Sequence, residues 1–128
     1  MTTELQTLTA RLAGAMGWEL CDPPNATVQC WVTPDGDFQS LDFLLTANGR
    51  EVVADWMREE RGLWVAYECS PSGVIVAFRT FSFGGGIVED SFHSYDSTTP
   101  GIHEAMALAF ARAAVGALEK IGAMKGGE

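Results

Sequence analysis

The chain has 128 residues, 47% of them hydrophobic and 20% charged, and its 17 acidic and 8 basic residues give a formal net charge of −9. This length predicts a single domain spanning residues 1–128, and the apolar content excludes a disordered chain. No run of Lys or Arg is present, so the cationic surface that nucleic-acid binding requires is not expected.

The first predicted element is an amphipathic helix that ends at Gly17. Four apolar residues at helical spacing form its stripe: Leu5, Leu8, Leu12 and Met16. Trp18 follows directly, and an aromatic residue just past a helix end is expected to pack back onto the core. Further on, residues 28–32 alternate as a strand does, and residues 33–37 have the composition of a turn.

The middle of the chain predicts a second helix. Residues 38–46 are apolar without a clean period, which fits either an extended approach to this helix or its first turns. The helix is expected from about Asn48 to Arg61, and Gly62 should end it. Its apolar stripe is predicted to consist of Val52, Val53, Trp56 and Met57.

The apolar period then changes from helical to alternating, which predicts a sheet. Residues 63–69 and 74–83 should pair as an antiparallel hairpin across a turn at residues 70–73. Residues 87–92 can add a third strand. Because the stretch 74–83 is apolar at nearly every position, both of its faces are expected to be covered.

The last predicted element is a long, Ala-rich helix. Thr99 suits its N-cap and Pro100 its first helical position. Gly122 should end it, and the tail at residues 123–128 is expected to be disordered. Its apolar face is predicted to consist of Ile102, Met106, Phe110, Ala113, Ala117 and Ile121.

Three consecutive glycines, Gly84 to Gly86, raise the question of a phosphate-binding loop. Such a loop needs a helix N-terminus directly after the glycines, because the helix end supplies the oriented N–H groups. Ile87 and Val88 follow instead and are typical of a strand, and no Gly-x-Gly-x-x-Gly or Lys-bearing phosphate loop is present. We therefore expect a hairpin turn. A Gly-rich tip that closes over a partner stays an open alternative.

The cysteines Cys21, Cys30 and Cys69 are odd in number and widely spaced, which favours reduced thiols and a cytoplasmic location. The N-terminus is polar where a signal peptide is basic and then apolar, and no apolar run approaches the ~18–20 residues that span a membrane. Grouping Cys21 and Cys30 with His93 and His103 would make a zinc site, but the spacing typical of zinc ligands is absent. No metal, cofactor or membrane association is predicted.

The same two histidines are the only candidates for catalysis that the sequence offers. His93 and His103 flank a stretch that ends at Asp96, and a His–Asp pair can carry out general acid–base chemistry. No Gly-x-Ser-x-Gly motif or recognisable catalytic cysteine accompanies them. No catalytic, cofactor-binding or metal-binding residue is therefore predicted.

The order of helix, short strand or loop, helix, paired strands and long final helix resembles that of the phage ABA-sandwich domain family. The resembling segments are Ala15-Met16-Gly17-Trp18, Phe43-Leu44-Leu45-Thr46 leading into Val52-Val53-Ala54-Asp55-Trp56, the paired strands, and Thr98-Thr99-Pro100 before Ala105 to Ala114. The resemblance implies a small phage or prophage protein with helices on both faces of a sheet. It supplies no catalytic residues.

These observations predict an α+β domain in which an antiparallel sheet of three to four strands is sandwiched by helices, in α/β/α layers. The favoured function is a non-enzymatic phage or prophage accessory protein that binds a host or phage protein through an acidic surface, in the host cell cytoplasm.

The alternative function is a sponge for a nucleotide signal in defence evasion, which would need Arg50, Arg79 or Arg112 to converge with an aromatic side chain. A hydrolase with His93 or His103 as its base is least favoured. Homo-oligomerisation stays open.

Overall fold

The computed structural model describes residues 3–21, 29–80, 86–94 and 101–124. Helix α1 (Thr3–Ala15) is followed by three short strands, β1 (Glu19–Cys21), β2 (Cys30–Val32) and β3 (Phe38–Ser40). A single 3₁₀ turn, η1 (Phe43–Leu45), leads into helix α2 (Ala47–Arg61). Three longer strands, β4 (Leu63–Ser70), β5 (Gly73–Thr80) and β6 (Ile87–Ser94), precede helix α3 (Ile102–Lys120).

The six strands form two separate antiparallel sheets, with orders β1-β2-β3 and β4-β5-β6. In the second sheet Leu63 pairs with Thr80 at one end of the hairpin and Ser70 with Gly73 at the other. The predicted hairpin and its third strand are confirmed. Of the first sheet, the sequence predicted only strand β2. The three residues of β1 are too few to show a period.

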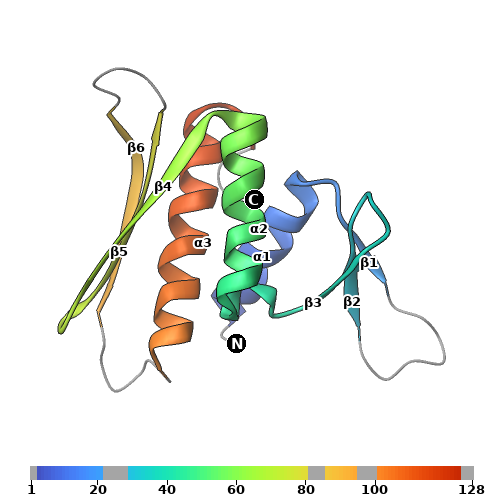
Figure 1. The fold of residues 1–128 in the computed structure, drawn as a ribbon, viewed down its shortest axis with the longest axis horizontal. Helices are drawn as coiled ribbons and strands as arrows, with labels where there is room; N and C mark the ends of the chain where they lie inside the picture. Colours follow the sequence, from blue (N-terminus) through green and yellow to red (C-terminus); the bar gives the residue numbers. More distant parts are fainter. Residues whose placement is uncertain (1–2, 22–28, 81–85, 95–100, 125–128) are drawn as a thin grey trace.

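The three helices lie between the two sheets (Figure 1). Helix α3 packs against β5 and β6 on one side and against α1 and η1 on the other. For this reason α3 is buried on nearly all sides from Ala105 to Leu118, and not along one face as predicted. Ile102 and Ile121, at the two ends of the predicted face, are 50% and 41% exposed.

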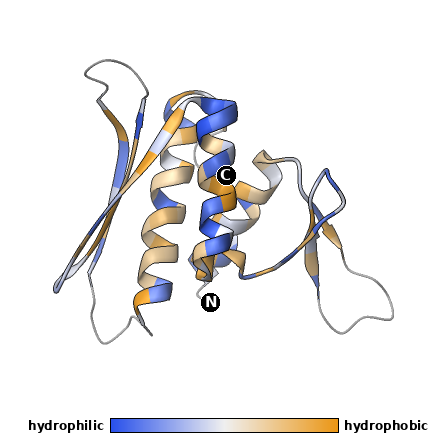
Figure 2. Cartoon of the chain, viewed as in Figure 1, coloured by the Kyte–Doolittle hydropathy of each residue, from blue (hydrophilic) through white to orange (hydrophobic). Residues whose placement is uncertain are grey.

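The distribution of hydrophobic residues matches this arrangement. Figure 2 shows that α3 is apolar along most of its length and that α2 has hydrophilic residues on the side that faces the viewer. The α+β class and the antiparallel sheet with helices packed on it are confirmed. The layer order differs from the one implied by the resemblance, since the described helices cover only one face of the β4-β5-β6 sheet. That face carries Val74, Val76 and Phe78, whose side chains are fully buried.

The opposite face of the β4-β5-β6 sheet is open among the described residues. It carries Trp64 on β4 and Phe92 on β6, which are 44% and 52% exposed. The apolar pattern of β5 predicted cover on both sides, but Ile75 on this face is only half-buried. Hydrophobicity on both faces of a strand therefore did not indicate two helical layers here.

Aromatic contacts join the helices to the sheet and to the loops. The Phe110 ring on α3 lies edge-on to Phe78 with ring centroids 5.5 Å apart, and it stacks on Tyr67 at 6.4 Å. Trp18 packs back onto the core as predicted, with its ring centroid 4.9 Å from that of Phe43. Pairs of this geometry add to the energy of area burial.

One glycine in α2 and one in α3 allow these helices to lie close to neighbouring residues. A Cβ at Gly49, in the first turn of α2, would collide with the Phe43 carbonyl. A Cβ at Gly116 of α3 would come within 2.6 Å of the Glu89 carboxylate. Gly49 therefore permits a close approach to the backbone that no other residue allows, whereas at Gly116 the neighbouring Glu89 side chain could turn aside.

Several predictions fall outside the described residues. These are the cap at Thr99 and Pro100, the strand beyond Thr80, Gly84 and Gly85, and the tail at 125–128. Helix α3 begins at Ile102, with Gly101 as its N-cap. At the start of the tail that was expected to be disordered, Ala123 and Met124 pack against the core, and the Ala123 N–H donates to the Leu118 carbonyl at 2.9 Å.

Candidate functional site

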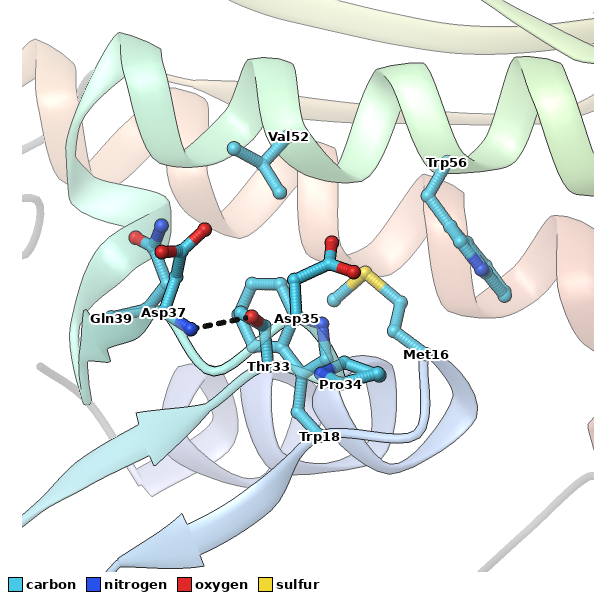
Figure 3. A pocket seen from close by; sticks show the side chains of 9 residues that line it. All are labelled: Met16, Trp18, Thr33, Pro34, Asp35, Asp37, Gln39, Val52 and Trp56. Carbon is cyan, nitrogen blue, oxygen red and sulfur yellow. Dashed lines mark hydrogen bonds between the residues drawn. The ribbon is translucent and has the colours of Figure 1, made fainter.

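A pocket of about 290 Å³ lies between the end of α1, the turn that joins β2 to β3, and α2 (Figure 3). We call it the Trp–Asp pocket. Its walls combine apolar side chains with two carboxylates. The lining residues are Met16, Trp18, Thr33, Pro34, Asp35, Asp37, Gln39, Val52 and Trp56.

The carboxylates are positioned by a tight turn. The Thr33 N–H donates to the Asp37 carbonyl at 2.9 Å, and the Asp37 N–H donates to Thr33 Oγ1 at 3.1 Å, as Figure 3 shows for the second bond. Gly36 adopts a φ of 88°, which glycine reaches without steric cost. The turn thus places Asp35 and Asp37 on one exposed loop beside the pocket.

The apolar wall comes from the end of α1 and from one side of α2. Met16 and Trp18 are each 8% exposed, and the contact with Phe43 holds the Trp18 ring in place. Val52 and Trp56 extend from α2 toward the side of the turn (Figure 3). They belong to the predicted core stripe, but only Val53 and Met57 of that stripe are buried in the core.

Trp56 already faces one cation within the chain. The Arg61 guanidinium lies 5.4 Å from the centre of its indole ring, which is within the range of a cation–π contact. Among the described lining residues, Asp35 and Asp37 are the only charged groups. The pocket therefore favours a positively charged group and disfavours an anion.

The two histidines do not meet in this pocket. His93 lies on β6, half-buried, and His103 lies exposed in the first turn of α3. Asp96, their proposed partner, lies outside the described residues. The pKa of Glu4 is held below its usual value mainly by hydrogen bonds from Arg112, with a smaller electrostatic effect from His93.

The three candidate arginines lie on three different elements. Arg50 is 5% exposed and donates from Nη1 to the Leu44 carbonyl at 2.9 Å, and burial lowers its pKa. Arg112 makes two hydrogen bonds to the Glu4 carboxylate, at 2.6 and 2.7 Å. Arg79 lies on the open sheet face, directly opposite Trp64. The first two guanidinium groups therefore have structural roles.

The cysteines divide into a pair and a single residue. Cys21 and Cys30 are cross-strand partners in the β1–β2 pairing, whereas Cys69 lies exposed on β4. In the described part of the chain, no group of three or more His, Cys, Asp or Glu side chains has a geometry that could hold a metal ion. The structure thus brings together Cys21 and Cys30, two of the four suggested zinc ligands, and does not group His93 or His103 with them.

A second depression, of about 250 Å³, lies on the open face of the β4-β5-β6 sheet. Its described lining contains charges of both signs, from Arg79, Glu68 and Asp90. The Arg58 guanidinium lies 5.5 Å from the centre of the nearby Trp64 ring. This depression has no excess of either charge large enough to select a small ion.

Comparison with known proteins finds no family model, curated protein or solved structure that matches the chain. The likeness to the phage ABA-sandwich family therefore remains an expectation from the residues. Among the described helices, none has both the length and the apolar character that a membrane span needs.

The Trp–Asp pocket was missed by the sequence analysis. Its carboxylates belong to Thr33-Pro34-Asp35-Gly36-Asp37, which was interpreted only as a turn. The available signal was the placement of two carboxylates in one short turn between two tryptophans, Trp31 and Trp56. That signal does not show which tryptophan the turn approaches, and the structure shows that Trp56 lines the pocket.

Proposed function

We propose that the chain is a non-enzymatic phage or prophage accessory protein that binds a host or phage protein by enclosing a Lys or Arg side chain in the Trp–Asp pocket. The observation that carries this proposal is the position of Asp35 and Asp37 beside an apolar wall in which no described residue is basic. A Lys or Arg side chain has the matching chemistry, an apolar stem with a cationic end.

The size of the pocket is compatible with a side chain as its occupant. Its volume of about 290 Å³ lies at the lower end of the roughly 300–1,000 Å³ that pockets for drug-sized ligands have. Trp and Arg are also enriched among the residues that dominate binding energy in protein interfaces, and a cation is attracted to the face of an indole ring. The net charge of −9 would speed the approach of a basic partner.

A nucleotide signal is the second candidate ligand. The observation that favours it lies elsewhere on the molecule. Trp64 and Arg79 are directly opposite on the open sheet face, so a base and a phosphate would find a ring and a guanidinium side by side. Glu68 and Asp90 in the same depression would repel the phosphate. A hydrolase receives no comparable support, because neither His93 nor His103 lines the Trp–Asp pocket.

The test is binding of short peptides that contain a single Arg or Lys between neutral residues, followed by intrinsic tryptophan fluorescence. Trp18 and Trp56 line the pocket, so an occupant should change their emission. Asp35→Asn with Asp37→Asn should weaken binding by roughly 2- to 25-fold, since each of the two exposed ion pairs that are lost contributes about 0.2–1 kcal/mol.

The matched control is Asp42→Asn with Glu60→Gln, which removes the same charge from exposed residues outside the pocket. Equal weakening by both double variants would mean that the peptide responds to net charge alone, and the proposal would then be wrong. A panel of nucleotides in the same assay tests the second candidate. A nucleotide response lost in Arg79→Gln and kept in the Asp double variant would favour that candidate.

A further inference from the structure

The two cysteines of the small sheet occupy directly opposite positions. Cys21 is the last residue of β1 and pairs in register with Cys30, the first residue of β2. Both side chains are half-buried thiols in the structure. Opposite residues in an antiparallel pair have Cα atoms about 4.5 or about 5.5 Å apart, and disulfides span Cα separations of about 4.4–6.8 Å. The backbone spacing therefore suits a disulfide.

The thiols also affect each other electrostatically. Desolvation raises the pKa of the Cys30 thiol, and the neighbouring Cys21 thiol raises it further through like charge and hydrogen bonding. Such an effect requires the two sulfur atoms to be close together.

Little opposes the small approach of β1 to β2 that a disulfide bond between the two cysteines would need. The Cβ atoms of opposite residues are about 4.5–5.5 Å apart, against about 3.5–4.5 Å in a disulfide, so the two strands must approach by up to about 1 Å. Strand β1 is an edge strand of three residues and pairs with β2 alone. The cysteines lie on the sheet face of the exposed residues Glu19 and Phe38, away from the face of Trp31.

We propose that Cys21 and Cys30 are a thiol pair that forms a reversible intramolecular disulfide by exchange with a low-molecular-weight disulfide such as oxidised glutathione. One thiolate attacks the glutathione disulfide, forms a mixed disulfide and releases one glutathione thiolate. The second thiolate then attacks the protein sulfur of the mixed disulfide, and the second glutathione leaves. Two protein thiols are oxidised, one disulfide is reduced to two thiols, and the two protons of the protein thiols pass to the departing glutathione.

The bond would close a ring from Cys21 to Cys30 and fix β1 to β2. Strand β2 continues directly into the turn that carries Asp35 and Asp37. The disulfide would form whatever the Trp–Asp pocket binds. In a reducing compartment the pair rests as the dithiol, and it oxidises when the compartment becomes more oxidising.

The test equilibrates the full chain in glutathione buffers of increasing oxidised fraction, traps free thiols with N-ethylmaleimide, and maps peptides by mass spectrometry. The expected product is one internal link between Cys21 and Cys30, with Cys69 alkylated or carrying glutathione. In Cys69→Ser the link should form at the same glutathione ratio. In Cys21→Ser, Cys30 should carry only glutathione, at a more oxidising ratio.

The disulfide is expected to form within the folded chain. The oxidised Cys69→Ser protein should therefore melt at a higher temperature than its reduced form. The proposal is overturned if Cys21 and Cys30 collect glutathione separately at the ratio that Cys69 does, or if the link appears only after the chain is unfolded in urea. It is also overturned if the oxidised protein melts at a lower temperature.

Discussion

Thr46 accepts a hydrogen bond from the Gly49 N–H at its side-chain oxygen, over 3.1 Å, and thereby caps the first turn of α2. The same hydroxyl donates to the Phe43 carbonyl at 3.0 Å, so one side chain joins η1 to the helix. Phe43 is 1% exposed and contacts Trp18, which lines the Trp–Asp pocket. The start of α2 is therefore connected to the pocket wall through one buried aromatic residue.

Gly49→Ala should lower the free energy of unfolding by about 1–3 kcal/mol, because the new methyl group would collide with the Phe43 carbonyl and overpacking has costs of this size. Gly14→Ala is the matched control. It lies within α1 with open space around its Cα, and it should raise stability by about 0.5–1 kcal/mol. Urea denaturation followed by circular dichroism measures both. Equal effects of the two substitutions would contradict this packing at η1.

Phe110→Ala should lower the free energy of unfolding by about 3–5 kcal/mol, since Phe110 is fully buried and its ring contacts both Phe78 and Tyr67. Phe110→Leu keeps most of the volume and should have a smaller effect. Denaturant unfolding gives the difference, and the near-ultraviolet circular dichroism signal should fall with the loss of the aromatic cluster. A loss below about 1 kcal/mol for the Ala variant would contradict a buried position between helix and sheet.

Glu4→Gln should reduce stability at neutral pH and have a smaller effect in acid. Hydrogen bonds from Arg112 hold the pKa of Glu4 below its usual 4.5, so the pair stabilises the fold above that pH. This contribution is lost as the pH falls through the folded-state pKa. Because Glu4 is about half exposed, solvent screening limits the effect to about 0.2–1 kcal/mol.

The measurement for this pair is urea denaturation of both proteins at pH 7 and at about pH 3, with Glu60→Gln as the control for the loss of an exposed carboxylate. The difference between wild type and Glu4→Gln should be smaller at the lower pH, because the pair's contribution is lost as the pH falls through the lowered pKa of Glu4. A difference that persists unchanged in acid would mean that the ion pair is not its cause.

The local elements could be predicted from the sequence because they follow from residue periodicity and turn chemistry. The stripe from Leu5 to Met16 located α1, and the change of period after Gly62 located the sheet that begins at Leu63. Helix α2 began near the expected residue, although its cap at Thr46 was not recognised. Each of these features depends on residues close together in the chain.

The arrangement of the layers depends on contacts between distant residues, and periodicity does not contain them. An apolar residue such as Val52 or Trp56 has the same pattern whether a neighbouring element covers it or a pocket lies beside it. In the same way, the pairing of Cys21 with Cys30 follows from β1, whose three residues show no period. The candidate site lies beside the β2–β3 turn, where neither the cover of α2 nor the pairing of the short strands could be predicted from the sequence.

Gly116 has a consequence for how α3 can sit on the sheet. The Glu89 side chain occupies the space that a Cβ at this position would fill, and its carboxylate lies 3.5 Å from the Lys120 amine. Sliding α3 by one turn, about 5.4 Å, would bring Arg112 or Lys120 to the place of the glycine, and the Glu89 side chain would have to turn aside to make room. An Ala-rich surface is smooth enough to permit several alignments, and the fit of Glu89 against Gly116 distinguishes the observed one from its neighbours.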